Sequence, residues 1–162
     1  MNFRLDYRNP QAVAEMKGSA LAPNLTGTVQ FFDAHGGTVV RADVCGLPPY
    51  KPAPQGGQPI GPFGFHIHEG PICGLGDGRN AFMGAAGHYN PKGQPHGNHA
   101  GDLPVLFSNN GCAHMIVYTS QFKPSHVVGH TVIIHQNPDD FRTQPAGNSG
   151  ARIGCGVIKA VE

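Results

Sequence analysis

Short segments in which apolar, β-branched and aromatic residues alternate with polar residues recur along the chain, separated by runs rich in glycine, proline and asparagine. This pattern is typical of strands that bury one face. It predicts about eight strands, at residues 12–17, 25–33, 38–44, 63–69, 103–107, 113–120, 130–136 and 154–160. The sequence His35-Gly36-Gly37 predicts a hairpin turn, so the second and third strands should pair antiparallel.

Three segments between these strands show no periodicity. Residues 48–62 form a loop rich in proline, glycine and glutamine, residues 70–101 form a longer loop, and residues 137–150 form a polar loop. In a compact domain, a loop as long as the second usually has a function or an internal crosslink. We therefore predict an all-β fold: an eight-stranded antiparallel Greek-key β-sandwich or barrel with two long functional loops, built as a single domain over residues 1–162.

Composition agrees with this fold class and excludes several others. Glycine (24) and proline (15) are abundant among the 162 residues, and only 13% of residues are charged, against a usual ~25%. Helical bundles and coiled coils need charged, helix-forming faces and few such breakers, whereas 39% apolar residues are enough to build a core. A net charge of +1 gives no basic footprint for nucleic acid, and no apolar run approaches the ~18 residues of a membrane span.

The chain has ten histidines and no tryptophan. His66 and His68 lie two residues apart in a predicted strand, so both imidazoles face one side and can reach one metal ion; alone, the pair could equally be a solvated strand face. Five further candidate ligands are His88, His96, His99, Asp102 and His135. Taken alone, His135 is typical of a capped residue at a strand edge. Together, six histidines and an aspartate beside one long loop predict a metal centre, and this ligand chemistry suits copper and zinc.

The sequence lacks the motifs of several other metal and catalytic sites. No cysteine pair has zinc-finger spacing, and His68-Glu69 is not followed by the second histidine of a His-Glu-x-x-His protease motif. No serine lies in a nucleophile elbow. The histidine-rich cluster therefore belongs to none of these three classes.

Five separated motifs occur in an order that resembles the copper–zinc superoxide dismutase family: GFHIHEG (64–70), GHYNP (87–91), HAGDLP (99–104), TVIIH (131–135) and GNSGARIGCGVI (147–158). The resemblance runs from about Leu25 to the C-terminus. It implies that copper is bound by His66, His68, His88 and His135. It implies that zinc is bound by His88, His96, His99 and Asp102. The zinc ligands are spaced compactly, and Gly97 and Gly101 would allow the tight turn that they need.

The resemblance also implies roles for individual residues. His88 would bridge both metals and take up a proton during the reaction, which makes it catalytic. Arg152 would be the second catalytic residue, a channel arginine whose fixed charge attracts the superoxide anion. Asp139 would be a carboxylate that binds ligand histidines rather than a metal, and it would link the two metal sites through them. Without the resemblance, Asp139 and Arg152 could each be a charged surface residue.

Four cysteines allow three full disulfide pairings. The resemblance implies a bond between Cys73 and Cys155. We then expect Cys45 to be a buried free thiol after its strand, and Cys112 to lie in a turn, exposed or paired elsewhere. A disulfide favours an oxidising compartment, but residues 1–10 lack the apolar core of a secretory signal, so we expect a cytoplasmic location.

The resemblance implies a superoxide dismutase that converts superoxide to dioxygen and hydrogen peroxide by copper redox cycling beside a histidine-bridged zinc. The alternative is a non-catalytic copper- and zinc-binding protein for metal buffering or delivery. A purely structural sandwich is a third hypothesis, which leaves the seven candidate ligands unexplained. The expected partner is the superoxide anion, with no nucleic acid and no membrane, and a homodimer is possible.

Overall fold

The computed structural model describes residues 7–77 and 80–162, and its main feature is one antiparallel sheet of eight strands. The strands are β1 (Ala12–Gly18), β2 (Thr26–Ala34), β3 (Gly37–Cys45), β4 (Phe63–His68), β5 (Asp102–Leu106), β6 (Ala113–Thr119), β7 (Thr131–His135) and β8 (Arg152–Ala160). Each one overlaps a strand predicted from the sequence, so the alternating pattern is confirmed as the signal for this fold. The predicted hairpin is also confirmed, because Ala34 pairs with Gly37 at the end of the β2–β3 ladder.

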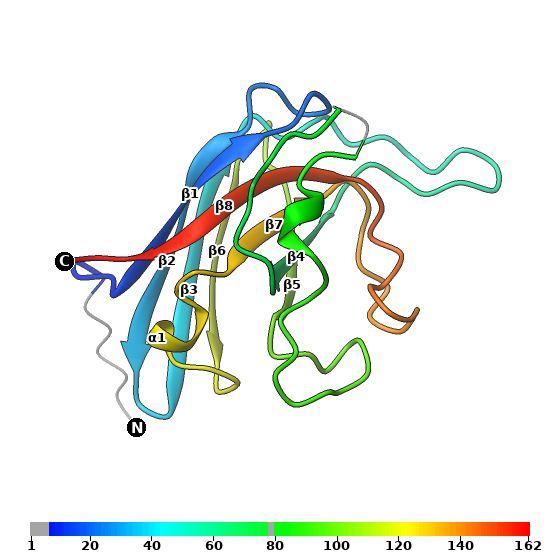
Figure 1. The fold of residues 1–162 in the computed structure, drawn as a ribbon. Helices are drawn as coiled ribbons and strands as arrows, with labels where there is room; N and C mark the ends of the chain where they lie inside the picture. The colour runs from blue at the N-terminus through cyan, green and yellow to red at the C-terminus, as the bar shows by residue number, and fades with distance from the viewer. Residues whose placement is uncertain (1–6, 78–79) are drawn as a thin grey trace.

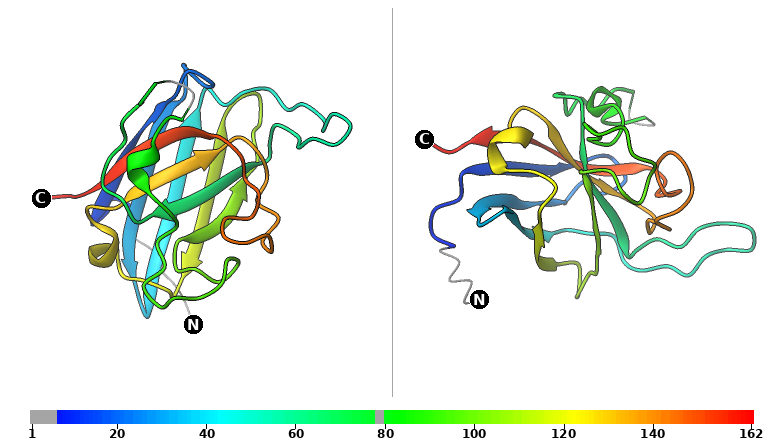
Figure 2. Two further views of the ribbon diagram at one scale, coloured as in Figure 1. Left: turned by 45° about the vertical axis from the view of Figure 1, so that its right-hand side comes forward. Right: turned by 90° about the horizontal axis from the view of Figure 1, so that it is seen from below.

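The strands follow the order β5-β4-β7-β8-β1-β2-β3-β6, and the sheet curls into a nearly closed barrel (Figures 1 and 2). β5 and β6 are consecutive in the chain, but they lie at the two ends of this order. They approach each other across the gap in the barrel. This arrangement is the all-β, antiparallel fold expected from the sequence, with long connections that cross between the two halves of the barrel.

Strands β4 and β7, the second and third in this order, are buried on both faces. Their inward side chains, including Phe65, Ile67 and Ile134, belong to the main hydrophobic core. Their outward side chains are covered by the long loops at residues 69–101 and 136–151, and Ile133 packs there against Phe82 in a second cluster. The loops therefore turn the outer face of these strands into a second interior, and the histidines of β4 and β7 lie in it.

Two helical turns lie outside the predicted pattern. A 3₁₀ turn, η1 (Met83–Ala85), lies in the first long loop, and a single turn of helix, α1 (Pro124–Val127), follows β6. α1 starts with a proline and buries Val127, which suits a short connector rather than a periodic element. In the described parts of the chain, no helix is long and apolar enough to cross a membrane.

The structure contains two disulfides, and one of them corrects the sequence analysis. Cys73 is joined to Cys155, as the resemblance implies. Cys45 is joined to Cys112, and both residues are exposed, so the expectation of a buried free thiol is wrong. The reason is the β3–β6 register. Val44 faces inward opposite Ala113. Cys45 follows Val44 and Cys112 precedes Ala113, so both cysteines face outward and lie opposite each other.

Candidate metal centre

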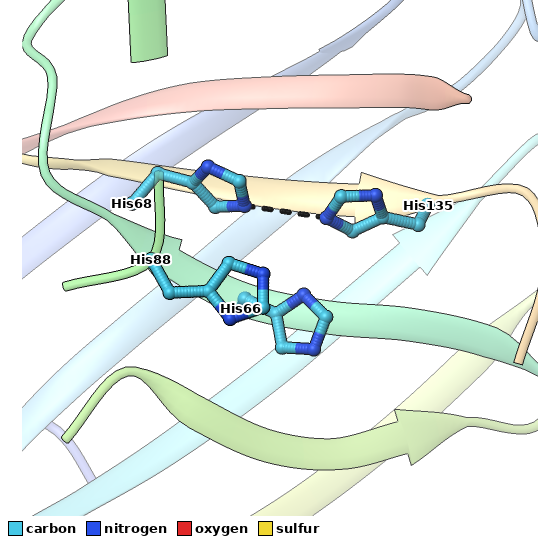
Figure 3. Close-up of side chains that lie close together, drawn as sticks. All are labelled: His66, His68, His88 and His135. Atoms are coloured by element: carbon cyan, nitrogen blue, oxygen red, sulfur yellow. Dashed lines mark hydrogen bonds between the residues drawn. The ribbon is translucent and has the colours of Figure 1, made fainter. Parts of the chain in front are cut away.

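Four histidines from three parts of the chain meet on the covered outer face of β4 and β7 (Figure 3). Alternation along β4 puts His66 and His68 on this face, and β7 ends in His135 beside them. An isolated bridge between His68 and His88 brings in the fourth ring from the long loop. One ring nitrogen of each histidine lies within 4.8 Å of the others, and the exposed fraction of each residue is 7% or less. We call this set the four-histidine group.

A second set of candidate ligands shares His88 with the first. It contains three imidazoles and one carboxylate within 4.8 Å of one another: His88, His96, His99 and Asp102. Asp102 starts β5 opposite His66, so the sheet itself holds the second group beside the first. The turn between the ligands depends on Gly97, whose φ is 93° and where a Cβ atom would lie 2.5 Å from the Phe141 carbonyl oxygen. We call this set the three-histidine–aspartate group.

Hydrogen bonds fix the orientation of the rings in the four-histidine group. The Ala86 carbonyl lies 2.9 Å from Nδ1 of His68, and the Gly150 carbonyl lies 3.3 Å from Nδ1 of His135. Each ring therefore turns its other nitrogen inward, and the two Nε2 atoms lie 3.2 Å apart. Backbone contacts of this kind set the tautomer and direction of ligand histidines in metal sites.

Among the described residues, three buried ring nitrogens have no hydrogen-bond partner: His66 Nδ1, His88 Nε2 and His96 Nδ1. Asp102 Oδ2 lies 3.2 Å from the last of these. Each one points into one of the two groups, because it is the nitrogen left free by the ring's other contact. Leaving such an atom unpaired in the interior costs about 1–3 kcal/mol. Metal ions coordinated by these nitrogens would remove that cost, so the residues present fit a two-metal centre.

The protonation states also suit metal binding. Burial, together with the nearby charge of His135 and His88, holds the pKa of His66 and His68 well below the usual 6.5. Burial likewise lowers the pKa of His135 to about 3. For Asp102, burial raises the pKa, but hydrogen bonds from the His88 side chain and the His99 backbone outweigh it and lower the pKa to about 2. Neutral imidazoles and an ionised carboxylate are the forms in which these side chains bind metals.

Asp139 connects the two groups by contacting the Nε2 atoms of one histidine from each. Its Oδ2 lies 2.6 Å from Nε2 of His66, and its Oδ1 lies 2.8 Å from Nε2 of His96. The residue is 5% exposed, so the alternative of a surface aspartate is wrong. Gly147 makes room for it, because a Cβ atom there would lie 1.8 Å from Asp139 Oδ1. One carboxylate thus orients a histidine of each group.

Arg152 lies at the start of β8, next to the four-histidine group. Its Nη1 donates to the Phe82 carbonyl at 2.8 Å, and its Nη2 donates to the Ala86 carbonyl at 2.5 Å. The Ala86 carbonyl is the same one that contacts His68. Burial lowers the pKa of Arg152, but a guanidinium with so high a normal pKa remains charged at physiological pH. The Cys73–Cys155 disulfide ties the same loop to β8.

Comparisons with known proteins agree with this geometry. The sequence profile described as Copper/zinc superoxide dismutase (SODC) matches residues 25–158. This chain belongs to the copper/zinc superoxide dismutase family. The chain is 36% identical over 154 residues to "Superoxide dismutase [Cu-Zn]" of Deinococcus radiodurans, with 85% of this chain and 79% of the relative covered.

Two further relatives extend the comparison. "Extracellular superoxide dismutase [Cu-Zn]" of Onchocerca volvulus is 32% identical over 169 residues, covering 91% of this chain and 75% of the relative. Among solved structures, the Cu/Zn superoxide dismutase from Brucella abortus matches with a TM-score of 0.70 and 29% identity, covering 90% of this chain and 98% of that one. The copper/zinc superoxide dismutase fold expected from the resemblance is thus confirmed by structure as well as by sequence.

A small depression lies beside the centre of this dismutase-family chain. It has a volume of about 280 Å³ and is lined by His135 and by residues of the segment 143–150. His135 is the one ligand histidine among its lining residues. The sequence analysis missed the backbone carbonyls of Ala86 and Gly150 that orient the rings, because any residue type supplies a carbonyl.

Proposed function

We propose that this chain catalyses the dismutation of superoxide, in which two superoxide ions and two protons give dioxygen and hydrogen peroxide. Copper would be held by the four-histidine group and zinc by the three-histidine–aspartate group. The observation that carries the proposal is the sharing of buried His88 by both groups, with Nε2 in one and Nδ1 in the other. When bound, copper supplies a one-electron redox couple and zinc supplies a fixed positive charge.

His88 is suited to moving a proton at a fixed place. Its Nδ1 lies 2.9 Å from Asp102 Oδ1 and 3.2 Å from His99 Nδ1, so this side of the ring is held by the second group. Its Nε2 faces the four-histidine group and has no protein partner. The ring can therefore gain and lose a proton at Nε2 without turning. This supports His88 as a catalytic residue.

Arg152 is suited to attracting and orienting the substrate. Its two donors to backbone carbonyls fix the guanidinium beside His68, at the edge of the centre. The net charge of the chain is only +1, so attraction of an anion depends on charges placed locally. This supports Arg152 as the second catalytic residue. The homodimer and the cytoplasmic location expected from the sequence stay predictions.

A superoxide-removal assay on protein loaded with copper and zinc tests the proposal. We expect one copper and one zinc per chain by elemental analysis, and superoxide removal that depends on copper. His135→Ala should remove copper binding and activity, whereas the matched variant His35→Ala, in the exposed β2–β3 turn, should keep both.

Two outcomes would contradict it. Removal of superoxide by the copper-loaded protein at the rate of the metal-free protein would favour the alternative, a non-catalytic protein for copper and zinc buffering or delivery. Metal removal by a chelator without any change in the free energy of unfolding would favour a purely structural role for the cluster.

A further inference from the structure

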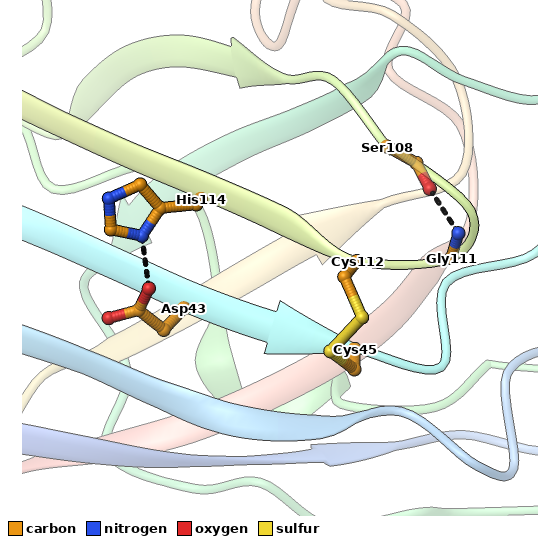
Figure 4. The surroundings of a disulfide bond; sticks show 6 residues. All are labelled: Asp43, Cys45, Ser108, Gly111, Cys112 and His114. Atoms are coloured by element: carbon orange, nitrogen blue, oxygen red, sulfur yellow. Dashed lines mark hydrogen bonds and ion pairs between the residues drawn. A yellow bond between two sulfur atoms is a disulfide. The ribbon is translucent and has the colours of Figure 1, made fainter.

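A second cluster of metal-binding residue types lies on the outer face of β3 and β6, away from the centre described above (Figure 4). It consists of two pairs of residues that face each other across the two strands: Asp43 opposite His114, and Cys45 joined to Cys112. We call these four residues the outer quartet. None of them belongs to either ligand group.

The strand geometry puts the whole outer quartet on one face. Asp43 and Cys45 are two residues apart on β3, and Cys112 and His114 are two residues apart at the start of β6. The residues between them point inward, since Val44 is 2% and Ala113 is 3% exposed. The same two-residue spacing brings His66 and His68 into one group on β4. A spacing that puts two side chains of one strand on the same face thus occurs once on each side of the β3–β6 ladder.

The four residues also line one depression, and Asp43 and His114 already contact each other. All four residues line a depression of about 450 Å³. Nδ1 of His114 and Oδ1 of Asp43 are hydrogen-bonded. The arrangement is that of His88 Nδ1 and Asp102 Oδ1 in the three-histidine–aspartate group. Arg41 Nε donates to the other carboxylate oxygen, Oδ2, at 2.6 Å, so the two oxygens of Asp43 have different partners.

The backbone holds the two cysteines in place whether or not the sulfurs are bonded. Their Cα atoms are 4.0 Å apart, and seven residue pairs from Thr38–Thr119 to Val44–Ala113 join β3 to β6 next to them. On the turn side, Asn109 and Cys112 exchange backbone hydrogen bonds at 2.7 and 3.1 Å. The Gly111 amide also donates to Ser108 Oγ at 3.0 Å. Opening the disulfide would therefore leave two thiols side by side, on the same face as Asp43 and His114.

We propose that reduction of the Cys45–Cys112 disulfide converts this depression into a second zinc site, formed by the outer quartet. A cellular dithiol transfers two electrons and two protons to the disulfide, which gives two thiols and the disulfide of the dithiol. Each thiol then loses its proton as zinc binds. Two thiolates, one imidazole and one carboxylate form a four-coordinate donor set that suits Zn²⁺. Both cysteines are exposed, so a reductant can reach them, whereas Cys155 of the other disulfide is 1% exposed.

The test counts zinc on the full chain with its main metal centre already loaded. A water-soluble phosphine, which consumes one water and becomes the phosphine oxide for each disulfide opened, is used without oxygen and removed by gel filtration. Equilibrium dialysis against Zn²⁺ alone should then show one additional zinc per chain in the reduced protein and none in the oxidised protein. Alkylation of the thiols should label Cys45 and Cys112 before Cys73 and Cys155.

Matched variants separate a built site from chance binding by thiols. The double variant Cys45→Ser with Cys112→Ser, reduced in the same way, should bind no additional zinc, and it also corrects for any zinc held by the other cysteine pair. In the reduced chain, His114→Ala and Asp43→Asn should each weaken the additional site at least tenfold. His35→Ala, at an exposed histidine in the β2–β3 turn, should leave it unchanged.

The proposal is overturned if the reduced chain binds no more zinc than the double serine variant. It is also overturned if His114→Ala or Asp43→Asn binds zinc as tightly as the unsubstituted chain, because the two thiols would then act without the rest of the quartet. Replacing Zn²⁺ with Co²⁺ adds an independent check. The absorption of thiolate-bound, four-coordinate Co²⁺ should appear on reduction and be missing from the double serine variant. These readouts do not depend on superoxide removal, so they stand apart from the proposed function.

Discussion

Besides the shared His88, Asp139 connects the two ligand groups by contacting one histidine of each, and Asp139→Asn tests that connection. The carboxylate accepts hydrogen bonds from His66 and His96 at the same time, whereas an asparagine offers one oxygen and turns its NH₂ group toward the second ring. One of the two rings would lose its orientation. We expect zinc affinity to fall about 10–100-fold, measured by competition with a chelator of known affinity.

The neighbouring residue provides the control for this prediction. Asp140 is exposed and contacts only its own loop, through Thr143 and the backbone amide of Arg142. Asp140→Asn should therefore keep the zinc affinity of the unsubstituted chain. Equal affinities for Asp139→Asn and Asp140→Asn would show that the carboxylate does not hold the two groups together.

Arg152 is the residue whose effect should depend on salt. Because its charge is placed at the edge of the centre and the chain is almost neutral overall, Arg152→Ala should slow superoxide removal about tenfold or more. The residual rate should also respond less to ionic strength, which rate measurements over a range of salt concentrations would reveal. Arg142→Ala, at an exposed loop position, is the control and should change neither value by a comparable amount. A loss of rate with unchanged salt dependence would contradict a role in electrostatic attraction.

At the residue scale, the candidate ligands could be predicted but their orientation could not. The two-residue spacing of His66 and His68 in a predicted strand identifies them as candidate ligands of one metal ion, and imidazole ligands limit which metals can bind. Whether Nδ1 or Nε2 faces inward depends on contacts with Asp139 and with the Ala86 carbonyl, far away in the sequence. A carbonyl has no sequence signal. The need for glycine at position 147 is visible only in the structure, where a Cβ atom would collide with the Asp139 carboxylate.

At the scale of elements, the two disulfides should contribute similarly to stability but differently to the site. They close sequence separations of 82 and 67 residues, so the loss of chain entropy in the unfolded state gives each about 4–5 kcal/mol. Urea unfolding should show a loss of this order for each pair of cysteines replaced by alanine. Only Cys73→Ala with Cys155→Ala should also slow superoxide removal, because that bond fixes the loop that holds Arg152. Normal activity in that variant would contradict this division.

The strands themselves follow from alternation, but their order in the barrel does not. Local pattern locates β5 and β6 on either side of a turn, yet these strands form the two edges of the sheet rather than a hydrogen-bonded pair. Which strands pair with β5 and β6 depends on how all eight strands bury their apolar faces in one core, and no short sequence segment contains that information. The same limit explains Cys45. β3 extends one residue further than predicted and includes Cys45, which alternation turns outward. The register between β3 and β6 then places Cys112 opposite Cys45.

At the scale of the whole molecule, the barrel supplies a rigid face and the long loops supply its cover. β4 and β7 present their histidines to the outside of the barrel, where water would normally keep an imidazole close to its usual pKa. The loops at residues 69–101 and 136–151 exclude that water, and their burial of the rings lowers the pKa of His66, His68 and His135. The cover that makes the centre chemically useful therefore also makes the stability of the metal-free chain sensitive to pH.

The sign of this sensitivity follows from proton binding. Below pH 6.5 the unfolded chain protonates these histidines, whereas the folded, metal-free chain keeps His135 neutral down to about pH 3. The unfolded state then binds more protons, so the free energy of unfolding is highest above pH 6.5 and falls as pH falls. Each histidine with a lowered pKa contributes up to about 1.4 kcal/mol per pH unit.

Urea unfolding of the metal-free chain from about pH 7 to about pH 4 should therefore show a steady loss of stability on acidification. His135→Gln removes one of the protonation sites responsible, so its stability should fall less steeply over the same range, whatever its value at neutral pH. His35→Gln changes an exposed histidine in the β2–β3 turn and should keep the slope of the unsubstituted chain. A slope unaffected by His135→Gln, or a stability that does not change with pH, would mean that the folded chain protonates these rings as readily as the unfolded chain. The loops would then not exclude water from the centre.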